Sequence, residues 1–132
     1  MQLKKISDDS ILIMSDNFVW VDEFAWSSVK QDIQPTMGGG LVVSENTVSA
    51  GRPITLESGD GVGVTRGTLK SLMILVNLSG EVFELTLPDG QVFNVIFDKK
   101  DNPVSGNPLT RLNVMPDSHP YNEVKLKFLE VE

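Results

Sequence analysis

The stretch VWVDEFAW, residues 19–26, places two carboxylates between the only two tryptophans of the chain. Side chains of these types could support two kinds of chemistry. Asp22 and Glu23 could act as a general acid and a general base, and Trp20 and Trp26 could stack on the rings of a sugar. In a third interpretation the strip serves packing and docking, since tryptophan is enriched at the centres of protein interfaces.

Strand geometry argues against the acid–base interpretation. If Asp22 and Glu23 lie in a strand, their side chains point to opposite faces, whereas the carboxylates of a glycosidase flank one bond at about 5 to 9.5 Å. Trp20 and Trp26 would share a face only if one continuous strand carried both. We therefore expect a solvated acidic turn at the two carboxylates and at least one tryptophan in the core.

Other polar residues fail the spacing tests for familiar sites. His119 is the only histidine and cysteine is absent, so a zinc site would need mostly carboxylate ligands, and no G-x-S-x-G elbow exists for a serine triad. The glycine-rich SGDGVGVTRG, residues 58–67, has Arg66 where a dinucleotide fingerprint needs a third glycine, and it lacks a P-loop lysine. We interpret it as a turn onto a helix.

Two polar groups have a composition that could bind calcium. One comprises Asp98, Asp101 and Asn102, and the other comprises Glu57 and Asp60. Neither follows the spaced ligand pattern of a calcium loop, and such residues are common in turns because they bond their own backbone. The sequence therefore predicts no catalytic residue, no metal and no cofactor.

Composition narrows the class of partner. The chain has 132 residues, which fits one domain spanning 1–132, and it carries 18 acidic against 11 basic residues for a net charge of −7. The basic residues are scattered, so we expect no nucleic-acid binding.

The first apolar run, Ile11 to Met14, is too short for a secretory signal, and no run approaches a membrane span. We expect a soluble protein.

Short alternating runs between Gly, Pro, Asn and Asp predict a mainly β domain. The clearest element is a hairpin, in which Phe83, Leu85 and Leu87 share one face, a Pro-Asp-Gly turn follows, and Phe93, Val95 and Phe97 alternate in the return strand. The other expected strands are 11–14, 18–21, 26–33, 41–43, 52–57, 109–114 and 124–131. In the last of these, Val124, Leu126 and Phe128 should share a face.

One helix is predicted over residues 65–78. Leu69, Leu72, Met73 and Val76 recur at helical spacing, so all four should be buried against the sheet. Thr65 or Thr68 can cap the start and Gly80 suits the end.

A family resemblance joins these elements. GRPITLES (residues 51–58), TLKSLMILV (68–76) and FELTLPDGQVFNVIF (83–97) give strand, helix and D-G hairpin in that order. This order resembles small baseplate and distal tail proteins of long-tailed bacteriophages, and the WVDEF segment and the terminal VKLKFLEV strand are also similar to them. The resemblance implies a β-sandwich or split-barrel-like domain with the helix packed on the sheet, and no catalysis or cofactor.

The resemblance also implies partners and a location. Such a protein forms a ring around the tail axis, commonly a hexamer, and docks other tail or baseplate proteins of the virion after synthesis in the host cytoplasm. This chain lacks the second, carbohydrate-binding-like domain of larger distal tail proteins. The proline-rich segment 99–123 is then expected to be a long loop that serves as an assembly arm. The candidate docking residues are Trp20, Trp26, Pro103, Pro108, Arg111, Pro116 and Tyr121. The alternative function is a non-catalytic carbohydrate-binding module built on the two tryptophans.

Overall fold

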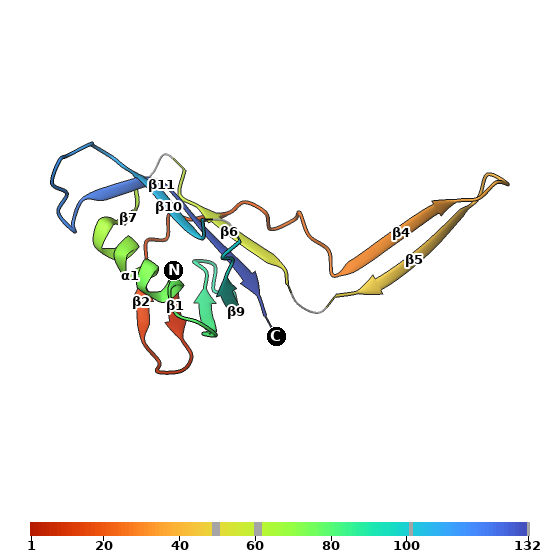
Figure 1. Cartoon of the computed structure of the whole chain (residues 1–132), viewed down its shortest axis with the longest axis horizontal. Coiled ribbons are helices and arrows are strands. Elements are labelled where there is room, and N and C mark those ends of the chain that lie inside the picture. The colour runs from red at the N-terminus through yellow and green to blue at the C-terminus, as the bar shows by residue number, and fades with distance from the viewer. Residues whose placement is uncertain (49–50, 60–61, 101, 132) are drawn as a thin grey trace.

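The computed structural model describes residues 1–48, 51–59, 62–100 and 102–131. Within these ranges it contains eleven strands and one helix, α1 (Arg66–Val76), as Figure 1 shows. This confirms the prediction of a mainly β domain with a single helix. The strands are β1 (Gln2–Lys5), β2 (Ile11–Ile13), β3 (Val19–Trp20), β4 (Val29–Pro35), β5 (Leu41–Thr47), β6 (Pro53–Glu57), β7 (Val62–Thr65), β8 (Phe83–Thr86), β9 (Val92–Phe97), β10 (Val104–Pro108) and β11 (Pro120–Glu130).

Nine of these strands form one antiparallel sheet, ordered β2-β1-β8-β9-β11-β6-β3, with β7 and β10 also paired to β11. The long β11 organises the sheet because it has two different neighbours on each side. Its first half pairs with β7 and β10, and its second half pairs with β6 and β9. The remaining strands, β4 and β5, pair only with each other.

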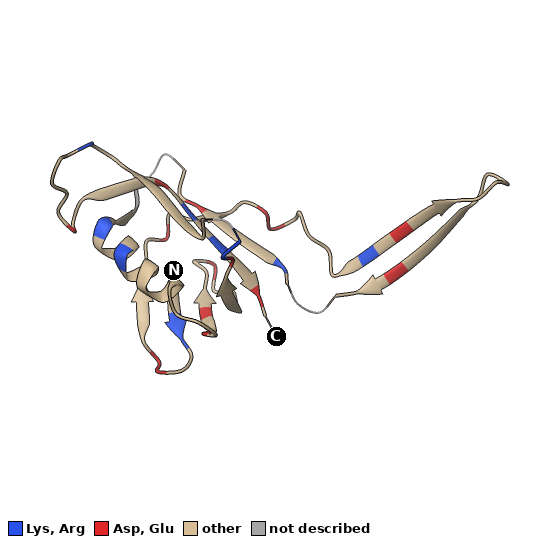
Figure 2. Ribbon diagram, in the orientation of Figure 1, with Lys and Arg blue, Asp and Glu red and all other residues tan. Residues whose placement is uncertain are grey.

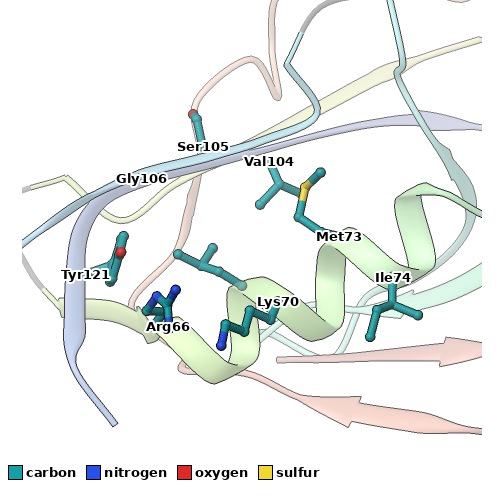
Figure 3. A pocket seen from close by; sticks show the side chains of 9 residues that line it. Arg66, Lys70, Met73, Ile74, Val104, Ser105, Gly106 and Tyr121 are labelled. Atoms are coloured by element: carbon teal, nitrogen blue, oxygen red, sulfur yellow. The ribbon is translucent and has the colours of Figure 1, made fainter. Parts of the chain in front are cut away.

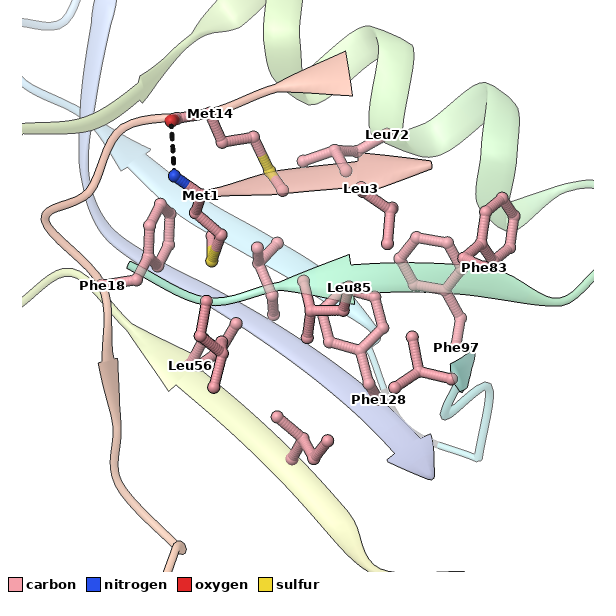
Figure 4. Packing of buried hydrophobic residues seen from close by; sticks show 14 of the residues in the cluster. Met1, Leu3, Met14, Phe18, Leu56, Leu72, Phe83, Leu85, Phe97 and Phe128 are labelled. Carbon is pink, nitrogen blue, oxygen red and sulfur yellow. Dashed lines mark hydrogen bonds between the residues drawn. The ribbon is translucent and has the colours of Figure 1, made fainter. Parts of the chain in front are cut away.

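The core is one cluster of apolar side chains from the inner face of this sheet and from α1. Leu3 of β1, Leu85 of β8, Leu56 of β6 and Phe128 of β11 are fully buried and converge in it (Figure 4). The predicted β8–β9 hairpin forms as expected, because its alternating large residues place one complete apolar face on this core. The predicted common face of Val124, Leu126 and Phe128 is also confirmed.

The N-terminal strands close one side of the cluster. Met1, Met14 and Phe18 are buried there, and the amino nitrogen of Met1 donates a hydrogen bond to the carbonyl of Met14 at 3.4 Å (Figure 4).

Helix α1 is slightly shorter than predicted, and one of its four core residues was wrongly assigned. Thr65 caps the start by accepting a hydrogen bond from the amide of Thr68, and Asn77 is the C-cap. Leu72 and Val76 are buried and Leu69 is partly buried, but Met73 is 42% exposed. The sheet covers a narrower stripe of the helix than the sequence pattern indicates, so Met73 faces a groove at the edge of the contact.

The proline-rich segment 99–123 is only partly a loop. It contains β10 and the first four residues of β11, and a loop from 109 to 119 joins these two strands. The predicted strand 109–114 is wrong, because this stretch lies in that loop. The predicted last strand begins earlier than expected, at Pro120 rather than Val124, because its first residues find partners in β7 and β10.

The element that extends from the body is the β4–β5 hairpin. It projects from the sheet as an isolated two-stranded ribbon, at the opposite end of the molecule from α1 and the 109–119 loop (Figure 1). Every residue of both strands is exposed. The sequence predicted strands at 26–33 and 41–43; the observed strands continue to Pro35 and Thr47, because each pairs with the other along its full length.

Candidate functional site

The WVDEF segment is fastened to the neighbouring strand β6 through backbone and side-chain bonds. The two carboxylate oxygens of Asp22 accept from the amide of Thr55 at 2.9 Å and from its hydroxyl at 2.8 Å. The Arg52 guanidinium donates to the carbonyl of Glu23 at 2.8 Å. Asp22 therefore continues the pairing of β3 with β6 after the strand has ended, and its environment is that of a structural clamp.

The two tryptophans have different surroundings. Trp20 is half-buried, with its ring edge-on to Phe93 at a centroid distance of 5.4 Å and with the Arg52 guanidinium 4.4 Å over its face. Trp26 lies outside the strands, near the start of the hairpin, where the Lys30 ammonium is 5.2 Å from its centroid. The continuous strand that would place both rings on one face does not form, because a turn at residues 21–25 separates them. The geometry thus favours packing for Trp20 and gives no shared stacking surface.

His119, the candidate for a catalytic or zinc-binding role, contacts its structural neighbours. The Nε2 atom of His119 accepts a hydrogen bond from the amide of Thr110 at 3.4 Å, and its ring lies edge-on to Tyr121. These contacts hold the 109–119 loop against β11.

The candidate metal ligands are also engaged locally. Glu57 pairs with Lys125 at 2.9 Å, and the Asp98 carboxylate accepts from the amide of Lys100. Asp60 and Asp101 fall outside the described residues. Across the described ranges, no group of three or more His, Cys, Asp or Glu side chains could hold a metal ion.

The β4–β5 hairpin has two unlike faces. The register pairs Ile33 with Val43 and Pro35 with Leu41, so these four apolar residues share one face near the tip. The opposite face carries Lys30, Asp32, Gln34, Ser44 and Asn46, with Val42 as its one apolar residue.

The outer part of the hairpin carries no charged residue. Its charged residues, Lys30, Asp32 and Glu45, all lie in the half nearer the body (Figure 2). The tip is tightly formed: the amide of Thr36 donates to the carbonyl of Gly40 at 2.8 Å, and Gly39 has a positive φ of 86°. An ordered ribbon with one bare apolar face is a surface of the kind that docks a partner.

A groove lies between helix α1 and strand β10, with a volume of about 480 Å³. We call it the α1–β10 groove. Met73 of the helix and Val104 of β10 reach toward one another across it, and Tyr121 closes one end (Figure 3). Gly106 allows the wall to form, because a Cβ there would meet the Val124 side chain at 3.1 Å. The full lining is Arg66, Leu69, Lys70, Met73, Ile74, Val104, Ser105, Gly106 and Tyr121.

The polar end of this groove carries more positive than negative charge. One oxygen of Asp117, in the 109–119 loop, contacts both Lys70 Nζ at 2.9 Å and Arg66 Nη1 at 3.5 Å. The hydrogen bond from Lys70, followed by the charges of Lys70 and Arg66, lowers the pKa of Asp117 below its ordinary value of 3.8. Two cations are thus balanced by one carboxylate.

The predicted docking residues fall in three places. Pro108 pairs with Tyr121, which lines the groove, whereas Pro103 lies at the other end of β10, where its carbonyl accepts from the amide of Lys127. Arg111 and Pro116 are exposed in the 109–119 loop, where the Pro116 carbonyl accepts from the amide of His119. Trp20 and Trp26 lie apart from both, next to β6 and at the base of the hairpin.

The sequence interpretation missed the hairpin face and the exposed side of α1. The signal for the hairpin was present, since Ile33 lies between the polar residues Asp32 and Gln34 before Gly38-Gly39-Gly40, and the apolar run from Leu41 to Val43 follows the glycines. For the helix, the signal was the uninterrupted apolar run from Leu72 to Val76, because five consecutive residues surround the whole helix axis and some of them must face away from the sheet.

The one helix in the described part of the chain is too short to cross a bilayer. Comparison with known protein families, with curated proteins and with solved structures finds no match to the chain.

Proposed function

We propose that this protein is a non-enzymatic structural component of a bacteriophage tail tip or baseplate, which assembles as a ring and docks other tail proteins. The observation that carries the proposal is the β4–β5 hairpin. It is an ordered ribbon that leaves the body, buries none of its own residues and presents Ile33, Pro35, Leu41 and Val43 on one side.

An isolated two-stranded hairpin is only marginally stable in water, because it has no layer to cover its apolar face. A face of this kind is usually covered in the working state of a protein. A second molecule is the cover that the fold leaves room for, because the hairpin extends away from its own body (Figure 1). Assembly therefore accounts for the feature, whereas catalysis or sugar stacking does not use it.

The placement of the hairpin supports assembly as a ring. A projecting element on one end and a body at the other make a heterologous contact, in which different patches of two identical chains meet. Heterologous contacts generate closed rings when the rotation between neighbours closes. The resemblance of the strand, helix and hairpin order to tail proteins supplies the biological setting.

The proposal is tested by shortening the hairpin. Residues 31–45 are replaced by Asn-Gly, so that the paired residues Lys30 and Asn46 flank a tight turn. We expect the body to keep its urea stability, because no buried residue is removed, while the protein disappears from purified tailed particles of the phage that encodes it. Quantitative mass spectrometry of particles complemented with either version provides the readout.

A matched control removes the opposite face only, with Gln34→Ser and Val42→Ser, and should leave incorporation intact. Absence of the wild-type protein from the particles, or normal incorporation of the shortened version, contradicts the proposed function.

A further inference from the structure

We propose that the α1–β10 groove of one copy receives the apolar face of the β4–β5 hairpin of a second copy. This inference rests on the proposed function, since it names the partner and the receiving surface of the same hairpin. Two features at opposite ends of the molecule carry this inference. One is the bare apolar ribbon of β4 and β5, and the other is the apolar groove between α1 and the free edge of β10; Figure 1 shows the positions of these elements.

The walls of the groove are apolar where a solvent-facing helix is ordinarily polar. Met73 is 42% exposed along it, and Ile74, on the outer side of α1, is 66% exposed (Figure 3). Methionine suits a docking wall because its unbranched side chain adapts to the shape of the partner. The groove therefore offers apolar contacts for the side chains of a ribbon laid against it.

Strand β10 adds a backbone edge to this surface. Among the described residues it pairs with β11 alone. The amide of Lys127 donates to the carbonyl of Pro103 at 2.9 Å, so the next residue, Val104, directs its amide and carbonyl away from β11. A free edge beside an apolar helix face is the arrangement that accepts an added strand, in which backbone bonds give affinity and pockets give selectivity.

The hairpin carries the matching features. Both of its outer edges are unpaired in the described structure, since β4 and β5 pair only with each other. Ile33 and Val43 form a cross-strand apolar pair on one face, and the stretch from Ile33 to Ser44 contains no charged residue. Burial of this stretch leaves no charge unpaired, which removes the main cost of an interface.

Charge complementarity orients the two surfaces. Arg66 and Lys70 at the polar end of the groove share the single carboxylate of Asp117, which leaves one positive charge in excess. Glu45 lies on the apolar face of the hairpin, two residues from Val43. With Ile33 and Val43 over Met73, the Glu45 carboxylate would approach the two cations. Complementary charges of this kind fix register and suppress wrong pairings.

The occupant is a second copy because the hairpin and the groove of one chain lie at opposite ends of the molecule (Figure 1). Each strand of the hairpin has seven residues, so the ribbon reaches about 23 Å beyond its base. That reach points away from its own helix α1. The same contact repeated from copy to copy is head-to-tail, as a ring requires.

A second cleft provides the competing location. It has a volume of about 560 Å³ and lies between the segment after α1 and the end of β9, with Glu81 and Asp98 among its lining residues. Lys99 there is already bonded to the carbonyl of Leu78 at 2.7 Å. Its lining also includes Lys100, so two carboxylates balance two ammonium groups and the cleft has no excess positive charge for Glu45. The α1–β10 groove is therefore the better match.

The absence of cysteine from the chain makes disulfide trapping a clean test. One preparation carries Val43→Cys and a second, with a size tag, carries Met73→Cys; they are mixed at a concentration where the wild-type protein is oligomeric and then oxidised. Since a disulfide requires Cα atoms within about 7 Å, we expect the mixed dimer to form about tenfold faster than in the controls.

The controls differ in one position each. Val42→Cys replaces Val43→Cys on the opposite face of the hairpin, where the exposed fractions of the two valines are 52% and 49%. Lys100→Cys replaces Met73→Cys and places the thiol in the second cleft. Urea melts of each variant check that the body stays folded, which these exposed positions permit.

The outcomes separate the inference from the proposed function. Equal trapping with Lys100→Cys, or no trapping with Met73→Cys, overturns the groove assignment and leaves the proposed function untouched. A wild-type protein that stays monomeric at millimolar concentration overturns the second copy as occupant. Preferential trapping of the Val43 and Met73 positions supports the inference. Normal incorporation of the hairpin-shortened protein into particles contradicts the proposed function alone.

Discussion

The body of the protein and its β4–β5 hairpin are built from the same kind of element and differ in what covers them. In the body, Leu85 of β8 and Leu126 of β11 are fully buried in a common core. In the hairpin, Ile33 and Val43 face each other across an equally regular register, yet both are exposed. Alternation of apolar residues specifies a strand face, but the cover of that face can come from another molecule.

The largest expected effect is a difference in stability between alanine substitutions of two isoleucines that both lie in strands. Ile54 in β6 is fully buried and Ile33 in β4 is 52% exposed. Ile54→Ala should lower the free energy of unfolding by about 2 to 5 kcal/mol through lost burial and a cavity. Ile33→Ala should change it by less than about 0.5 kcal/mol. Urea denaturation of the free protein measures both, and equal losses would show that the hairpin packs on its own body.

The next effect should appear in assembly rather than in folding. If Val43 is buried at a neighbour, Val43→Ser removes roughly 1.5 to 3 kcal/mol of contact, which corresponds to a tenfold or greater loss of association. Val42→Ser, on the opposite face, should leave association within about twofold, because that face stays in water. Sedimentation over a concentration series gives both constants, and similar losses for the two valines would remove the distinction between the faces.

The junction between body and hairpin supplies a smaller effect. Asp22→Ala leaves the amide and hydroxyl of Thr55 without their acceptors and should cost roughly 1 to 3 kcal/mol of stability. Glu23→Ala removes the adjacent carboxylate and should cost less than about 0.5 kcal/mol, because the contact of Glu23 with Arg52 uses its backbone carbonyl. Thermal melts of the two variants provide the comparison, and the opposite order would disprove the clamp.

The smallest effect concerns the pKa of Asp117 beside the α1–β10 groove. The hydrogen bond and charge of Lys70 and the charge of Arg66 lower this pKa in the folded protein. Because the folded value lies below the unfolded one, the stabilisation is present above the ordinary pKa and is lost as the pH falls through the lowered value. An NMR titration of the carboxyl carbon should give a midpoint below 3.8, and Lys70→Met should return it toward that value. A midpoint that does not respond to Lys70→Met would mean that the pair is open in solution.

The sequence supported prediction wherever local pattern and core burial agree. The β8–β9 hairpin was predictable because Phe83, Leu85, Val95 and Phe97 alternate on both sides of a Pro-Asp-Gly turn, and the core covers that face. The start of helix α1 was predictable because Thr65 is a strong N-cap. The exposure of Met73 was not predictable, because the width of the covered stripe depends on where β10 lies.

Two features depend on long-range pairing that local pattern does not record. Strand β10 has the sequence VSGNP, with a single large apolar residue, and it is extended because β11 offers a free edge. The sequence of the β4–β5 hairpin is typical of an ordinary pair of strands. Nothing in it indicates that these strands leave the main sheet and pair only with each other. Five of the seven candidate docking residues were accordingly placed in the segment 99–123, and of these only Tyr121 lines the groove.

Hydrogen exchange of the hairpin amides, measured at low and at high protein concentration, tests most directly whether a second molecule covers the hairpin. We expect β4 and β5 to exchange much faster than β11 in the free protein, because their bonds have no covering layer, and we expect assembly to slow their exchange together with that of β10. Hairpin amides as slow as those of β11 in the free protein, or unchanged on assembly, would contradict this expectation.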